Sequence, residues 1–120
     1  MLAKTYRKRI IKSMEALGTY KPEFSQTINE LATMLEDLDK TREKFEESGG
    51  NVVVIHTNKN GSKNLAKNPL YLAIEGLRTQ ILNYSKELGL TPAGLKKIKD
   101  KGLEGDTQSE FLEALKEFGS

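Results

Sequence analysis

Two stretches of this chain repeat apolar residues at alternating intervals of four and three, and this spacing limits the possible fold more than any other feature. In the first stretch the repeated positions are Phe24, Ile28, Leu31, Leu35, Leu38 and Phe45, and Arg42 takes the one charged slot in the series. In the second stretch they are Leu70, Ile74, Leu77, Ile81, Tyr84 and Leu88. A heptad stripe of this kind places the apolar side chains on one face of an α-helix. We expect a mainly α-helical protein whose core and oligomerisation seam is built from these two helices, packed antiparallel.

Proline and glycine mark the ends of both helices. Pro22 suits the first turn of the first long helix, because its missing N–H costs nothing there, and the Gly49-Gly50 pair ends that helix. Asn68 and Pro69 form an N-cap followed by proline at the first helical position of the second long helix. Gly89 ends this helix, so each of the two has its own start and stop signals.

The segment between the long helices has a different character. Residues 52–55 are a β-branched run that disfavours a helix, and the Asn60-Gly61 pair suits a type I′ turn. We therefore expect a small β-hairpin over about residues 51–67. Short amphipathic helices are expected at residues 4–17 and 91–98, and a capping box of Thr107 and Glu110 predicts one more.

This pattern divides the chain into three parts. Residues 1–21 form a basic N-terminal helix, residues 22–101 form the helical-hairpin core with its β-hairpin, and residues 102–120 form an acidic C-terminal segment. Leu72 and Leu82 fall outside the heptad seam and need a cover, which either the N-terminal helix or another subunit must supply. Since a thin hairpin has little interior of its own, we expect self-association. The alternative is a monomer in which the N-terminal helix covers everything.

Residues that could support catalysis are scarce. The chain has no cysteine, which excludes disulfides, thiolate metal sites and a cysteine nucleophile. Its one histidine, His56, has no evident partner and is interpreted as a polar residue on a solvated strand face. No glycine-rich phosphate loop is followed by Gly-Lys-Ser/Thr. We expect no enzyme, metal or cofactor, and neither a signal peptide nor a membrane span.

Charge is distributed in blocks that the formal net charge of +2 conceals. Two basic blocks are candidates for binding the phosphates of DNA. They consist of Lys4, Arg7, Lys8, Arg9 and Lys12 in the first helix, and of Lys96, Lys97 and Lys99 near the end of the core. The hairpin adds Lys59, Lys63 and Lys67, whereas residues 104–117 are acidic and suit docking to a basic surface. Amphipathic helices also use Lys and Arg simply to solvate themselves, so both interpretations of the first block remain open.

Taken together, these motifs resemble the small subunit of phage terminase. The resemblance rests on Asn68-Pro69, the long helix that follows, and the sequence Gly89-Leu90-Thr91-Pro92-Ala93, and it extends from the first helix to Lys101. It implies a ring-shaped homo-oligomer in the host bacterial cytoplasm that recognises double-stranded viral DNA and passes it to the large terminase subunit, which holds the ATPase and nuclease. The segment before Pro22 is too short for a separate helix-turn-helix, so DNA recognition falls to the first helix or the lysine clusters.

Two other functions are compatible with the same residues. The chain could be a structural helical-hairpin module that binds only protein, with the heptad seams as its whole purpose. Light scattering with and without DNA separates this function from DNA binding. An enzyme is the third possibility, and it would require a metal or nucleotide bound near His56.

Overall fold

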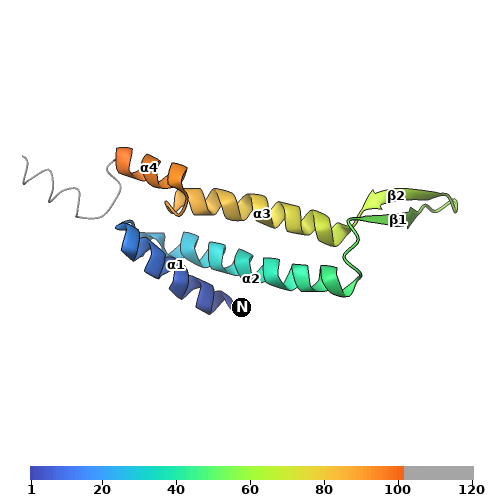
Figure 1. The fold of residues 1–120 in the computed structure, drawn as a ribbon, viewed down its shortest axis with the longest axis horizontal. Helices are drawn as coiled ribbons and strands as arrows, with labels where there is room; N and C mark the ends of the chain where they lie inside the picture. Colours follow the sequence, from blue (N-terminus) through green and yellow to red (C-terminus); the bar gives the residue numbers. More distant parts are fainter. Residues whose placement is uncertain (102–120) are drawn as a thin grey trace, which may run out of the picture.

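The structure is a computed structural model that describes residues 1–101. Its main feature is a hairpin of two long helices, α2 (Ser25–Glu47) and α3 (Pro69–Glu87), which run antiparallel (Figure 1). A β-hairpin extends beyond one end of this pair. Towards the other end, α1 (Ala3–Leu17) packs against α2, and α4 (Pro92–Asp100) packs against α3. The expected mainly helical fold, a long helical hairpin with a small β-hairpin insertion and short flanking helices, is confirmed.

The hydrophobic core lies where three helices meet, away from the β-hairpin. Its buried residues come from α1, from α2 and from the end of α3: Ile10, Met14, Ile28, Leu31, Ala32, Met34 and Leu88. Among the heptad residues expected to form the seam, the buried ones are Ile28, Leu31, Leu38, Ile74 and Leu88. The half-buried ones are Phe24, Leu35, Phe45, Leu70, Leu77, Ile81 and Tyr84. Two helices enclose a seam only from two sides, so the positions at its rim keep some contact with solvent.

The start of the first long helix differs from the prediction. Pro22–Phe24 form a 3₁₀ turn, and the α-helix begins only at Ser25. In this turn the Phe24 N–H donates to the carbonyl oxygen of Lys21, three residues earlier, at 3.0 Å. An α-helix would use a carbonyl four residues earlier. The predicted end is confirmed, because Gly49 and Gly50 both adopt positive φ after Glu47.

The β-hairpin consists of β1 (Val53–Thr57) and β2 (Lys63–Lys67), with Ile55 opposite Leu65. The predicted type I′ turn is wrong. That turn needs positive φ at two successive residues, but only Gly61 has it, at +85°, and the Gly61 N–H donates to the carbonyl oxygen of Asn58 at 2.9 Å. This is a type I turn followed by a glycine, the usual form of a three-residue hairpin loop.

Side-chain caps fix the start of α3 and the start of α4, as the sequence indicated. The Asn68 side-chain oxygen accepts a hydrogen bond from the Leu70 N–H at 3.0 Å, and its amide group donates to the carbonyl oxygen of Asn51 at 3.0 Å. Asn68 thus joins the base of the β-hairpin to the helix. After Gly89 ends α3, the Thr91 hydroxyl accepts from the Gly94 N–H at 3.1 Å and opens α4.

The position of α1 decides which face of the helical hairpin stays uncovered. This helix lies on α2, and Leu72 and Leu82 of α3 remain 50% and 49% exposed within residues 1–101. The alternative in which the N-terminal helix covers these leucines is therefore wrong. The last predicted short helix, with its capping box of Thr107 and Glu110, lies outside the described residues.

Candidate nucleic-acid interface

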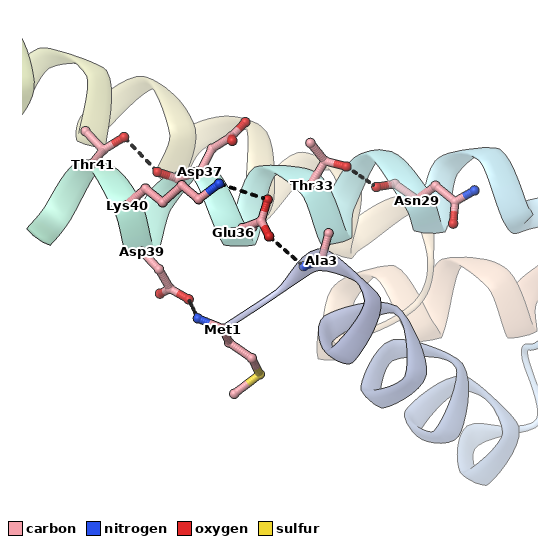
Figure 2. Close-up of polar contacts among 9 residues, drawn as sticks. All are labelled: Met1, Ala3, Asn29, Thr33, Glu36, Asp37, Asp39, Lys40 and Thr41. Atoms are coloured by element: carbon pink, nitrogen blue, oxygen red, sulfur yellow. Dashed lines mark hydrogen bonds and ion pairs between the residues drawn. The ribbon is translucent and has the colours of Figure 1, made fainter.

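Two carboxylates of α2 hold the start of α1 (Figure 2). The first turn of α1 has no acidic residue and no side-chain cap of its own, so its free N–H groups need an outside acceptor. Glu36 accepts from the Ala3 N–H at 3.1 Å. Asp39 accepts from the amino group of Met1 at 3.2 Å and from the Tyr6 hydroxyl at 2.5 Å. Negative charge at a helix N-terminus is favourable, which fixes α1 in place.

The same contacts shift the pKa values of the groups involved. The hydrogen bond from the Ala3 N–H is the main reason that the pKa of Glu36 lies below its ordinary value. The hydrogen bond from Tyr6, followed by that from the Met1 amino group, lowers the pKa of Asp39. Its counterpart is a raised pKa for the Tyr6 hydroxyl, whose proton is held by Asp39. Both carboxyl groups therefore favour the charged form in the folded protein.

The outer side of α1 carries the first predicted DNA-binding block. All of its members are exposed: Lys4, Arg7, Lys8, Arg9 and Lys12. Lys4, Lys8 and Lys12 lie four residues apart, so they follow one stripe on successive turns of the helix. The ion pairs found in residues 1–101 involve other groups, and Glu15 is the one acid in the helix. These cations are available for an anionic ligand.

The second predicted block lies on α4, with Lys96, Lys97 and Lys99 all exposed. The structure adds a cation that sequence reasoning missed, because Lys86 of α3 lines the same shallow hollow as Lys97 and Lys101, together with Glu87. The two helices approach so closely because residue 94 is glycine. A Cβ atom at Gly94 would lie 2.1 Å from the carbonyl oxygen of Lys86. The only feature of the sequence that could have pointed to Lys86 is its position in the last helical turn before Gly89.

The structure brings the two basic blocks to the same end of the molecule but on different helices. α1 lies on the α2 side of the helical hairpin and α4 on the α3 side (Figure 1). The hairpin lysines lie at the opposite end, and Lys67 there pairs with Glu75 at 3.1 Å. Phosphates bound by α1 and α4 in one chain would therefore belong to separate points along a ligand. A long polyanion can provide such points.

Other kinds of site find less support in the described part of the chain. His56 is exposed on β1, opposite Asn64 of β2. Across residues 1–101, His, Cys, Asp and Glu side chains form no group of three suited to a metal ion. Among the same residues, no helix combines the length and apolar character needed to cross a membrane. The prominent chemical feature of the described surface is exposed positive charge on two helices.

Fold and surface together define a class of protein: a helical hairpin with basic helices at one end, suited to binding. Comparison with known families assigns it more narrowly, because residues 3–104 match the family described as phage terminase, small subunit. The chain belongs to this family, which confirms the predicted resemblance. Neither a curated protein nor a solved structure matches the chain. Membership gives the chain a role in phage DNA packaging, within a family that is in general non-catalytic, interacts with DNA and the large subunit, and acts in the host cytoplasm.

Proposed function

We propose that this protein is the DNA-recognition and regulatory component of the packaging machine, and that it brings viral DNA to the large terminase subunit. The observation that carries this proposal is the exposed stripe of Lys4, Lys8 and Lys12 on a helix anchored by α2. Three cations at a fixed spacing neutralise successive phosphates at a low entropic cost, because the anchored helix is already ordered. Lys96, Lys97 and Lys99 of α4 supply a second set of contacts.

Self-association into a ring is the second part of the proposal. The outer face of α3 supports it, because Leu72 and Leu82 are 50% and 49% exposed there. Gly76, Thr79 and Asn83 lie on the same face, and Glu75 and Lys86 are its charged residues. Nothing in the described chain requires a glycine at position 76, since an added Cβ would meet no atom within 4 Å. Glycine inside a helix nevertheless costs about 1 kcal/mol of stability relative to alanine. Close approach of a second subunit would explain it. Repeating α1 around a ring multiplies a modest basic surface.

The salt dependence of DNA binding tests the role of α1. We expect the affinity for duplex DNA to fall steeply with salt, and Lys8→Gln to lower the slope of log K against log salt by about 1 for each Lys8 that contacts phosphate. Lys44→Gln is the matched control, because Lys44 is an exposed helical lysine among the acids Glu43, Glu46 and Glu47. Equal slopes for the two variants would remove α1 as the DNA surface.

One observation favours the alternative of a protein-interaction module without DNA binding. Ile55 and Leu65 face each other across the β-hairpin and are 68% and 77% exposed. Apolar side chains that lie side by side and exposed form a candidate contact site for protein. An oligomer whose mass and stability do not respond to DNA at low salt would support this alternative, and the salt titration then gives no binding to analyse.

A further inference from the structure

An open groove with a mainly apolar lining follows α1 on the side nearest the loop between α3 and α4. Its lining residues are Tyr6, Arg9, Ile10, Ser13, Ala16, Leu17, Leu35 and Leu90. The groove has a volume of about 590 Å³. Leu17 is 37% exposed, and Leu35 and Leu90 are half-buried, so residues 1–101 leave apolar surface uncovered here. Arg9 is the one charged residue of the lining, and it is positive.

We infer that the acidic C-terminal segment of the same chain, residues 107–118, docks in this groove as an amphipathic helix. The inference uses the sequence of this segment, which lies outside the described residues. The capping box of Thr107 and Glu110 favours a helix start. The apolar residues then follow at helical spacing: Phe111, Leu112, Leu115 and Phe118. They supply one continuous face to fill an apolar groove.

This groove combines an apolar lining with positive charge, whereas the hollows beside Lys97 and beside Lys4 are lined mostly by charged or polar residues. The segment carries acids at Glu110, Glu113 and Glu117 against one base, Lys116. Arg9 lies in the groove and Lys12 is exposed on the same helix. Helix-in-groove recognition combines an apolar contact with opposite charge at the rim, and both are present here.

The connecting chain is long enough for the segment to reach its own groove. α4 ends at Asp100, so six residues separate it from Thr107. Six extended residues span about 20 Å. The molecule measures 25 × 19 Å across its long axis, and α1 and α4 lie towards the same end of it (Figure 1). The groove is therefore within reach of the same chain.

Docking has a consequence for ligand binding, and this consequence rests on the proposed function. Carboxylates of the docked segment would lie beside Arg9 and Lys12, where they would compete with DNA phosphates for the same cations. The segment would then act as an internal competitor that weakens the binding of DNA to α1.

Disulfide trapping in the full chain tests the docking, because the chain contains no cysteine. Ser13→Cys lies in the groove, and Ala114→Cys lies at the edge of the predicted apolar face. Thr33→Cys with Ala114→Cys is the matched control, since Thr33 is exposed and lines a different hollow beside Lys4 and Arg7. We expect the Ser13 pair to close at least about tenfold faster than the Thr33 pair, because docking raises the effective concentration of the two thiols.

Each outcome of the trapping experiment decides the inference. Rapid closure within one chain that Leu115→Asp abolishes supports docking. Equal closure of both pairs overturns it, and so does a disulfide-linked dimer, which would assign the groove to the segment of a second copy. DNA binding is measured separately on the oxidised and reduced Ser13 pair. Trapping without a change in DNA affinity would keep the docking and reject only its effect on DNA binding.

Discussion

Gly94 is the residue on which the packing of α4 against α3 depends. Its position leaves no room for a side chain, because an added Cβ would lie 2.1 Å from the carbonyl oxygen of Lys86. We expect Gly94→Ala to lower the free energy of unfolding by about 1–3 kcal/mol, the usual effect of overpacking. Urea unfolding followed by circular dichroism measures this change. An unfolding midpoint equal to that of the wild type would contradict the close contact.

The anchoring carboxylates make the attachment of α1 sensitive to acid. The pKa values of Glu36 and Asp39 are lowered in the folded state, so the unfolded chain takes up protons first as the pH falls. Their contribution is complete above the ordinary carboxyl pKa of about 4 and is lost as the pH falls through the lower, folded pKa values. We expect α1 to detach over this acid range, which NMR signals of Ala3 and Tyr6 would report.

Asp39→Asn is the matched variant for this titration. It keeps the size of the side chain but removes the charge, so we expect weaker docking of α1 at neutral pH and a flatter response to acid. The same acid response in the variant and the wild type would show that other groups control the attachment.

Single residues also show what sequence can and cannot predict. The caps at Asn68 and Thr91 were predictable, because a cap depends on residues within one helical turn. The turn at Asn60 was not, since hydrogen bonds decide its form: the Asn60 side chain accepts from the Ser62 N–H at 3.1 Å and from the Ser62 hydroxyl at 2.7 Å. Lys86 was missed for a related reason. Its place beside α4 depends on Gly94, which is eight residues away in sequence, and on the packing of α4 against α3 that Gly94 allows.

Whole elements were more predictable than their packing partners. The apolar periodicity of α1, α2 and α3 indicated each helix, because one apolar face repeats over several turns. That periodicity does not specify which neighbour covers the face. Here Glu36 and Asp39 on α2 hold α1 at its N-terminus, so α1 covers α2 and leaves the outer face of α3 exposed.

Gly76 allows the proposed role of this α3 face to be tested. Gly76→Ala adds a methyl group that meets no atom within 4 Å in the chain, and it should stabilise the helix by about 0.5–1 kcal/mol. If a second subunit packs closely here, the same methyl group holds that subunit away and self-association becomes weaker. We expect higher stability towards urea together with a smaller mass in light scattering. Unchanged assembly would place the contact between subunits elsewhere.

The whole molecule is elongated, and its core and its basic helices are concentrated towards one end. The chain measures 81 × 25 × 19 Å, with the three-helix core and both basic blocks towards one end and the β-hairpin at the other (Figure 1). The heptad stripes predicted an elongated helical hairpin. They could not predict that the basic helices lie on opposite sides of it, because this arrangement depends on the packing of α1 and α4. Under the proposed function, a single copy would therefore present one short basic helix to a given stretch of DNA.

The proposed binding of DNA through α1 consequently requires several copies to act together. Multi-angle light scattering of the wild-type chain, alone and with duplex DNA at low salt, tests this requirement most directly. We expect a mass several times the 13.4 kDa of one chain before DNA is added, and a larger complex with DNA that dissociates at high salt. A mass of 13.4 kDa at micromolar concentration, unchanged by DNA, would contradict the account.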